Sequence, residues 1–250
     1  MRQARDLLEA HDIALVAAPN AGPYTLSGTN SWIVGRDPAH LIDPGPAIDS
    51  HLDALFAELS TRGGAGAILL THDHRDHAEA AALACERSGA PLAAARKDAT
   101  IRLEDGMRVG PLTALATPGH AADHFSFIAG RVCFSGDLVL GSGSVFVAAE
   151  PGALRAYLAS LERLRALDLE LIAPGHGPLV TDPAAKLDAY IAHRLDRERM
   201  LLAALADGLR DRDELLDRVW ATTPPELRPA AAATLDAHLA KLAEEGRLPD

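Results

Sequence analysis

The chain has 250 residues, a formal net charge of −11, two cysteines and 48% hydrophobic residues. Together with a charged fraction of 24%, these values are typical of a globular protein and exclude disordered and fibrous chains. No apolar run approaches the roughly 20 residues that span a bilayer. The excess of acidic residues argues against sequence-independent binding to phosphate backbones. We therefore expect neither a membrane nor a DNA partner.

The first 180 residues predict a layered domain of strands and helices. Ile128 to Val132 reads as a tight hairpin with its turn at Gly130. Helices are predicted at 49–62, 76–88 and 151–167. Apolar runs of strand length are IALVAA (13–18), SWIVG (31–35), HLID (40–43), GAILLT (66–71), PLAAA (91–95), LTALAT (112–117), FSFIAG (125–130), RVCFSG (131–136) and LELIAP (169–174). This mixture indicates an α/β or α+β fold.

The sequence changes character at Asp182-Pro183, a pair typical of a helix start. Beyond it, helices are predicted near 183–208, 211–221 and 225–245, with almost no strand signal. Such a tail looks like a winged-helix-type unit whose wing is cut short. We therefore predict a first domain over residues 1–180 and a helical, winged-helix-like domain over residues 181–250, with the helix at 183–208 as a candidate connector.

Side chains that bind metals follow four of the strand-like runs. They are His72, His74, Asp76 and His77 after the run 66–71, His120 after 112–117, Asp137 after 131–136 and His176 after 169–174. Because the end of a strand can aim a loop residue into a cleft, four strand ends would supply one shared cluster. Imidazole nitrogens and carboxylates suit zinc and its first-row neighbours. Seven ligands are too many for one tetrahedral ion but sufficient for two ions bridged by a carboxylate.

The alternative is a chance clustering of histidines, because a lone histidine is usually a surface residue or a satisfied core residue. Three histidines and an aspartate within six residues argue against chance, as do three more ligand types that each follow an apolar run and a glycine. A metal site is therefore the stronger interpretation.

The same residues carry a family resemblance. The segment THDHRDH, TPGH with His120, SGD with Asp137 and PGHG with His176 resemble the metal motifs of the metallo-β-lactamase fold superfamily, and GTN (28–30) and LIDPG (41–45) fit them. Within that superfamily the chain is most similar to the β-lactamase-like protein 2 branch, through TPGHAADHFSF, FSGDLVLGSGS, APGHGP and IAHRLDRER. One departure is Ala78-Glu79-Ala80, where the family often has glycines. Glu79 would then lie near the cleft mouth or on the solvent face of its helix.

The resemblance implies an αββα sandwich with a two-metal site at one edge. It assigns His72, His74 and His120 to a first ion. It assigns Asp76, His77 and His176 to a second ion, with Asp137 bridging the two. Asp76 and Asp137 would be the catalytic carboxylates, and Asp76 could also act as a base. The expected cofactor is two Zn²⁺, with Mn²⁺ or Fe as alternatives.

Four further residues are candidates for roles around the site. Asp43 is expected to support the ligand loops by hydrogen bonding, and Asn30 to stabilise a nearby loop. His124 either lines the substrate pocket or is structural. His193, next to Arg194, either reaches the cleft to meet an anionic substrate or has a solvated or domain-bridging role. The run from Gly141 to Ser144 is expected to shape the cleft wall.

The leading functional hypothesis is a dinuclear hydrolase that uses a metal-bound hydroxide on a small acyl substrate, namely a thioester, lactone, ester or β-lactam. The alternatives are an endoribonuclease acting on single-stranded RNA, an iron dioxygenase with a single ion, and a non-catalytic binding protein. The charge of the tail argues against the RNA alternative, because residues 181–250 carry 10 basic and 14 acidic residues. The tail would instead shape the substrate entrance or mediate homodimer formation. Because Cys85 and Cys133 form no disulfide framework, a cytoplasmic setting is expected.

Overall fold

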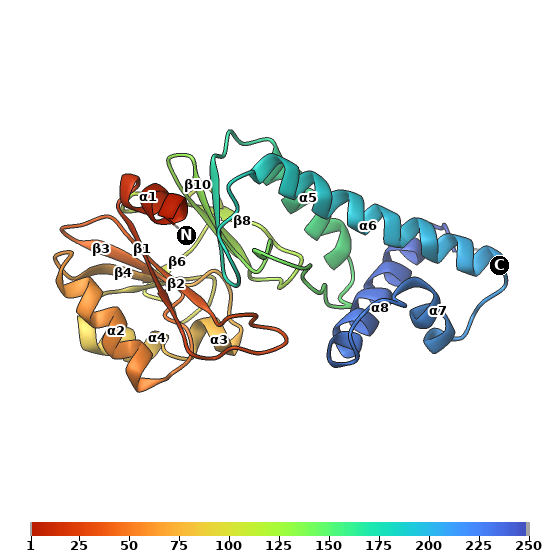
Figure 1. Cartoon of the computed structure of the whole chain (residues 1–250), viewed down its shortest axis with the longest axis horizontal. Helices are drawn as coiled ribbons and strands as arrows, with labels where there is room; N and C mark the ends of the chain where they lie inside the picture. Colours follow the sequence, from red (N-terminus) through yellow and green to blue (C-terminus); the bar gives the residue numbers. More distant parts are fainter. Residues whose placement is uncertain (1, 249–250) are drawn as a thin grey trace.

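The computed structural model describes residues 2–248, which form two stacked β-sheets with helices on both outer faces and a helical extension (Figure 1). One sheet has six strands in the order β1 (Ile13–Ala17), β2 (Asn30–Val34), β3 (Ala39–Ile42), β4 (Ala65–Leu69), β5 (Leu92–Ala94) and β6 (Ile101–Arg102). The other has five, in the order β11 (Leu171–Pro174), β10 (Val132–Gly136), β9 (Phe125–Ala129), β8 (Leu112–Ala116) and β7 (Arg108–Val109).

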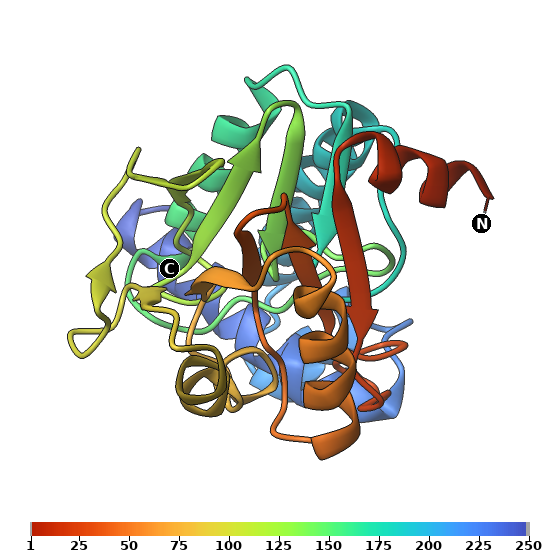
Figure 2. The ribbon, with the colours of Figure 1, turned by 90° about the vertical axis from the view of Figure 1, so that its left-hand side faces the viewer.

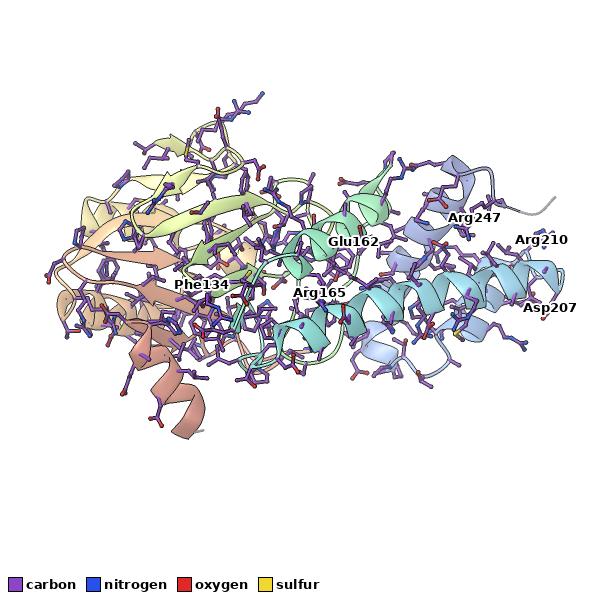
Figure 3. All side chains as sticks on the ribbon, turned by 90° about the horizontal axis from the view of Figure 1, so that it is seen from above. Phe134, Glu162, Arg165, Asp207, Arg210 and Arg247 are labelled. Atoms are coloured by element: carbon purple, nitrogen blue, oxygen red, sulfur yellow. The ribbon has the colours of Figure 1, made fainter. Side chains whose placement is uncertain are left out.

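The core between the sheets follows from the two-residue period of a strand. In β2, Trp32 and Val34 point into this core, whereas Ile33 packs on the helical side. Phe127 of β9 and Phe134 of β10 fill the core from the other sheet, and Phe134 is seen inside the sandwich in Figure 3. Because both faces of the central strands are covered, most residues of those strands are apolar and buried on either face.

Helices cover the outer face of each sheet, so the layers are α, β, β and α (Figure 2). On the six-stranded sheet, α2 (Asp49–Ser60) and α4 (Ala81–Ser88) bury their apolar sides against the strands. On the five-stranded sheet, α5 (Ala153–Arg165) does the same. It lies beside the first half of α6 (Pro183–Ala206), as Figure 3 shows. There Arg165 Nε is 2.7 Å from Asp188 Oδ1.

The tail consists of α6, α7 (Arg212–Val219), the 3-10 turn η1 (Pro225–Leu227) and α8 (Arg228–Glu244). The Asp182 side chain caps α6 by accepting a hydrogen bond from Ala185 N at 3.0 Å. Further along α6, Leu201 and Leu205 pack with residues of α7 and α8 in a separate core, whereas Leu187 belongs to the core under α5. Helix α6 therefore joins the sandwich to the other helices of the tail, as Figure 1 shows.

The fold class predicted from the sequence is confirmed, and so is the hairpin, in which β9 and β10 pair around Gly130. The predicted helix at 76–88 is instead two helices, α3 (Arg75–Ala78) and α4. They are separate because the loop after β3 takes their backbone groups: Gly45 N donates to His77 O and Ala80 N donates to Gly45 O, both at 3.0 Å. The terminal helix α1 (Arg2–Ala10) and the short β6 and β7 were not predicted.

The predicted division near residue 180 stays a prediction. Among the described residues, no helix is both long enough and apolar enough to cross a membrane.

Candidate metal centre

Seven histidine and aspartate side chains meet at one edge of the sandwich, although they come from four separate places in the chain. His72 and His74 follow β4, and α3 adds Asp76 and His77 in the next turn. The three others follow β8, β10 and β11, namely His120, Asp137 and His176. The structure thus brings together every residue that the sequence singled out as a ligand.

The first trio is formed by His72, His74 and His120. The Nδ1 atom of His74 lies 3.0 Å from His72 Nε2 and 3.0 Å from His120 Nε2. Three ring nitrogens that converge in this way, with His72 and His120 buried, present lone pairs to one point. This arrangement fits a cation with nitrogen ligands.

The second trio is formed by Asp76, His77 and His176. His176 Nε2 lies 3.2 Å from His77 Nε2 and 3.1 Å from Asp76 Oδ2, and His77 Nε2 lies 3.7 Å from the same oxygen. Two imidazoles and a carboxylate make a second donor set suited to a first-row divalent ion.

Asp137 lies between the trios and gives one oxygen to each. Its Oδ2 is 3.7 Å from His120 Nε2, and its Oδ1 is 3.5 Å from both His77 Nε2 and His176 Nε2. Oδ1 is fully buried and has no hydrogen-bond partner, which is costly for a carboxylate oxygen unless a cation compensates it. The donor set therefore fits two metal ions that share this carboxylate.

The ring nitrogens that face away from the cluster contact oxygen atoms in four of the histidines. These contacts are His72 Nδ1 with Thr71 Oγ1 at 3.0 Å, His77 Nδ1 with Asp43 Oδ2 at 2.8 Å, His120 Nδ1 with Phe146 O at 3.1 Å and His176 Nδ1 with Gly28 O at 3.2 Å. A nitrogen that donates its proton outward leaves the inward nitrogen free to act as a ligand. The surrounding oxygens thus set the tautomer that metal binding needs.

Asp43 forms hydrogen bonds that reach one histidine of each trio. Its Oδ2 accepts from Thr71 Oγ1 at 2.7 Å as well as from His77, and its Oδ1 accepts from Thr71 N at 2.8 Å. Because the Thr71 hydroxyl donates to Asp43, it accepts from His72. One buried carboxylate therefore orients a histidine in each trio.

Asn30 holds the loop that carries His176. Its Nδ2 donates to Pro174 O at 3.0 Å and to Gly177 O at 2.9 Å, on either side of the histidine. Asn30 thus makes the loop contact that the sequence suggested.

His124 lies behind Asp137 and not in a pocket wall, so the pocket-lining alternative is wrong. Its Nε2 accepts from Asp137 N at 3.2 Å, which requires that Nδ1 carry the proton donated to Thr117 Oγ1 at 2.9 Å. Burial lowers the pKa of His124 to about 3, so it is neutral at physiological pH. It fixes the backbone of Asp137. Glu79 lies on the solvent side of its helix, paired with Arg75.

Burial and charge act oppositely on the two trios. Burial lowers the pKa of His120 to about 4 and that of His72 well below its ordinary value. Burial also disfavours protonated His176 and His77, but the nearby carboxylates outweigh it, raising the pKa of His176 to about 9 and that of His77 well above normal. Burial acts to raise the pKa of Asp137, but the charge of His77 outweighs it and holds that pKa well below its usual range.

These shifts predict how pH affects the protein after chelation of metal. The folded pKa of His176, about 9, lies above its ordinary value of 6.5, so the stability it contributes is fully present below pH 6.5 and is lost as pH rises through 9. We expect the melting temperature of the chelated protein to fall over that range, in a scanning-calorimetry series across pH. The metal-loaded protein should fall less, because bound ions replace the protons. Parallel curves with and without metal would contradict this prediction.

A pocket of about 360 Å³ opens over the cluster. Four cluster residues line it, namely His74, Asp76, His120 and Asp137. The remaining walls come from the N-terminal part of the chain, from the segment after Asp137 and from the tail. They are Pro23, Tyr24 and Leu26, then Leu140, Ser142, Gly143, Ser144, Val145 and Phe146, and finally Arg194, Trp220, Thr222, Thr223, Pro224, Leu227, Ala230, Ala231 and Thr234. The pocket is thus charged at the cluster and largely apolar elsewhere, and the run from Gly141 to Ser144 adjoins and shapes its wall.

Residues 140–147, called here the wall loop, are held by the tail. The bonds are Leu140 N to Tyr190 Oη at 3.1 Å, Tyr190 Oη to Gly143 O at 3.0 Å, Arg194 Nη2 to Val145 O, and Val147 N to Thr234 Oγ1 at 3.2 Å. The same loop carries Phe146 O, the acceptor of His120. The tail therefore supports a candidate ligand through this loop.

His193 is half-buried and does not line the pocket, so the alternative in which it reaches the cleft gains no support, whereas the adjacent Arg194 lines the pocket. Burial, followed by the charges of Arg194 and Arg197, lowers the pKa of His193 to about 4. We expect His193→Ala to leave kcat and KM within about twofold, because it removes no pocket contact. Steady-state kinetics beside the wild type would check this, and a large rise in KM would return His193 to the site.

Two residues that orient ligands were not singled out from the sequence. Thr71 stands between β4 and His72, and a hydroxyl residue at a strand end, next to a ligand, was an available signal. Phe146 acts through its backbone carbonyl. Because every residue has such a carbonyl, its identity gave no signal.

Comparison with known proteins identifies relatives of both parts of the chain. The family model described as the metallo-beta-lactamase superfamily matches residues 24–109 and 97–176, and that of the beta-lactamase associated winged helix domain matches residues 212–248. A beta-lactamase-like protein 2 homolog of Caenorhabditis elegans is 32% identical, covering 94% of this chain and 85% of its own. An atrochrysone carboxyl ACP thioesterase of Aspergillus novofumigatus is 32% identical, covering 78% and 63%.

Solved structures agree with these matches. A metallo-beta-lactamase family protein of Thermus thermophilus is 25% identical, covers 94% of each chain and superimposes with a TM-score of 0.77. A second, TTHA1623 in a di-iron-bound form, is 33% identical, covers 68% of this chain and 96% of its own, and has a TM-score of 0.56.

Proposed function

Because the chain belongs to the metallo-beta-lactamase superfamily, we propose that it is a dinuclear metal hydrolase acting on small acyl substrates, with thioesters first among them. The observation that carries the proposal is the pair of ligand trios that share Asp137 beneath a pocket with mostly apolar walls. A thioesterase among the relatives supports the choice of thioesters.

Two ions held by the trios would supply a nucleophilic water at neutral pH and would polarise the bond to be cleaved. The residues of the chain supply substrate binding and proton transfer. The apolar walls bind and orient the acyl group and exclude water around it. Asp76 lines the pocket, and although burial acts to raise its pKa, hydrogen bonding to His176 helps to hold that pKa below normal, so Asp76 is ionised. Its Oδ2 belongs to the second trio, which leaves Oδ1 as the proposed proton acceptor.

An acyl substrate fits this pocket better than RNA does. Arg194 is the sole Arg or Lys among the residues that line the pocket, within the described part of the chain. A nucleic-acid strand needs several cations along its phosphates, whereas an acyl chain needs apolar walls. The endoribonuclease and the iron dioxygenase are retained as alternatives for the test below.

Zinc is the proposed metal, because a donor set of imidazoles and carboxylates suits it. Iron is the principal alternative, given that a relative has been solved with two irons. We further propose that the protein acts in the cytoplasm and that the tail supports homodimer formation, as expected from the sequence.

Metal content and turnover test the proposal together. The protein would be purified without chelator, its metals quantified by elemental analysis, and its activity measured on matched thioesters, esters, lactones and β-lactams, on labelled single-stranded RNA, and on a persulfide with an oxygen electrode. Two zinc ions with thioester cleavage are expected. RNA cleavage without acyl cleavage, or one iron with oxygen consumption, would overturn the acyl hydrolase.

A further inference from the structure

Arg194 is a buried cation in the wall of the pocket. It lies midway along α6, only 2% of its surface is exposed, and it lines the pocket from the tail side. Burying a charge is costly unless the charge is paired. The groups that contact this guanidinium therefore show whether its charge is paired within the protein or is available to a ligand.

No carboxylate pairs with Arg194 among residues 2–248. Its Nη2 donates to Val145 O, its guanidinium lies 5.2 Å from the ring centre of Tyr157, and its Nε is buried without a hydrogen-bond partner. These neutral contacts leave the positive charge uncompensated.

A second buried arginine in the same chain shows the usual arrangement. Arg62 is 7% exposed and pairs with two carboxylates, at 2.7 Å from Glu58 Oε1 and 3.2 Å from Asp12 Oδ1. Near Arg194 itself, the carboxylate of Glu198 is already taken by Lys241 at 2.7 Å and by Arg247 at 2.6 Å. Of the two arginines that are buried among residues 2–248, the one that faces the pocket is therefore the one without a paired anion.

The other groups around Arg194 do not supply a negative charge. His193 and His238 have pKa values lowered to about 4 and about 3, by burial and then by Arg194, so both are neutral at physiological pH. Arg197, one turn along α6, donates to Val219 O and lies over the ring of Trp220. The pocket thus presents one unpaired cation beyond its apolar walls.

We propose that Arg194 binds a carboxylate carried by the acyl part of the substrate, so that the enzyme prefers acyl groups with a terminal carboxylate. The inference rests on the proposed function: the bond to be cleaved lies at the cluster, the carbon chain lies along the apolar wall, and the carboxylate meets Arg194. A single cation matches a single negative charge, and the planar guanidinium matches a carboxylate in shape. A phosphate dianion would need more cations than this wall offers.

The test uses pairs of thioesters on one neutral thiol, N-acetylcysteamine. Each pair has a dicarboxylic acyl group, from succinyl to suberyl, and its terminal methyl ester. We expect wild type to favour one or more of the free acids over their methyl esters. Arg194→Gln should lower kcat/KM for the preferred acid by about 10- to 100-fold, mainly through KM, and lower kcat/KM for the methyl ester much less, through the lost contact with Val145 alone. Arg197→Gln, on the same helix but outside the wall, should keep the preference. Equal loss on acid and ester in Arg194→Gln would overturn the proposal.

Because Arg194 also holds Val145, the variants need a check on folding. Arg194→Lys retains the charge without the planar fork and should retain part of the preference, with a melting temperature and metal content close to wild type. The same acyl groups would also be tested as thioesters of coenzyme A, a thiol that carries phosphates. If kcat/KM depended on those phosphates and not on the carboxylate of the acyl group, the carboxylate assignment would be overturned.

Binding without turnover separates this inference from the proposed function. Glutarate should raise the melting temperature of the metal-loaded wild type more than pentanoate does, and this difference should vanish in Arg194→Gln. Such a result without cleavage of any of the thioesters, esters, lactones and β-lactams would reject the hydrolase and keep the anion site. Cleavage with neither a glutarate difference nor an acid preference would reject the anion site and keep the hydrolase.

Discussion

Asp137→Ala is expected to abolish binding of two ions and to lower kcat/KM by more than about a hundredfold. Removing a hydrogen-bond partner behind a metal ligand already costs about 10–100-fold in metal affinity or activity, and Asp137 faces both trios directly. Elemental analysis after dialysis against limiting metal would give the stoichiometry, and steady-state kinetics the activity.

The fold of this variant should remain, because the backbone of Asp137 is still held by His124 and by the strand β10. Circular dichroism would check this. Asp168→Ala is a matched control, since its carboxylate lies on the surface and pairs with Arg131. Two ions per chain in the Asp137 variant would refute the shared-carboxylate assignment.

Asp43→Asn should lower activity by about 10–100-fold and remove the second ion in preference to the first. An amide in place of Oδ2 would present N–H groups to His77 Nδ1, which itself donates to Asp43 in the wild type. His77 would then have to change tautomer and place its proton on Nε2, the nitrogen that faces His176. A protonated Nε2 cannot bind a metal.

Thr71→Ser is the control for this chain of hydrogen bonds, because serine keeps the hydroxyl between Asp43 and His72. We expect it to retain most of the activity and both ions. Metal titration by calorimetry would resolve the two binding events. An Asp43→Asn variant that binds both ions with wild-type affinity would show that the carboxylate does not set the tautomer of His77.

The mixture of strands and helices and the ligand cluster could be predicted because both depend on short-range patterns, whereas the αββα order of the layers and the division of the ligands into two trios were implied by the family resemblance. Apolar runs of strand length indicated where strands form, and the polar residues directly after them had to meet wherever the strand ends meet. Asp43, for example, follows β3 as His72 follows β4, and the two strands are parallel neighbours. The start of α6 was predictable from the Asp182-Pro183 pair.

The pocket wall was not predictable, because it depends on how the tail packs against the sandwich. His193 and Arg194 are adjacent in sequence, but neighbouring residues of a helix point about 100° apart, so only one of them could face the pocket. The sequence did not indicate which of the two residues faces the pocket. His124 was similarly ambiguous, because its role depends on the backbone N–H of Asp137, which comes from a different strand end.

During translation, the seven candidate ligands leave the ribosome before the residues that hold the wall loop. His176 is the last ligand in the chain, and Tyr190, Arg194 and Thr234 all follow it. Until α6 and α8 dock, the tail does not hold the loop that places Phe146 O against His120, and the pocket lacks its tail-side wall. We therefore expect the nascent chain to be able to bind metal before it can bind substrate, so that the proposed hydrolysis begins only after α8 has been synthesised and has docked.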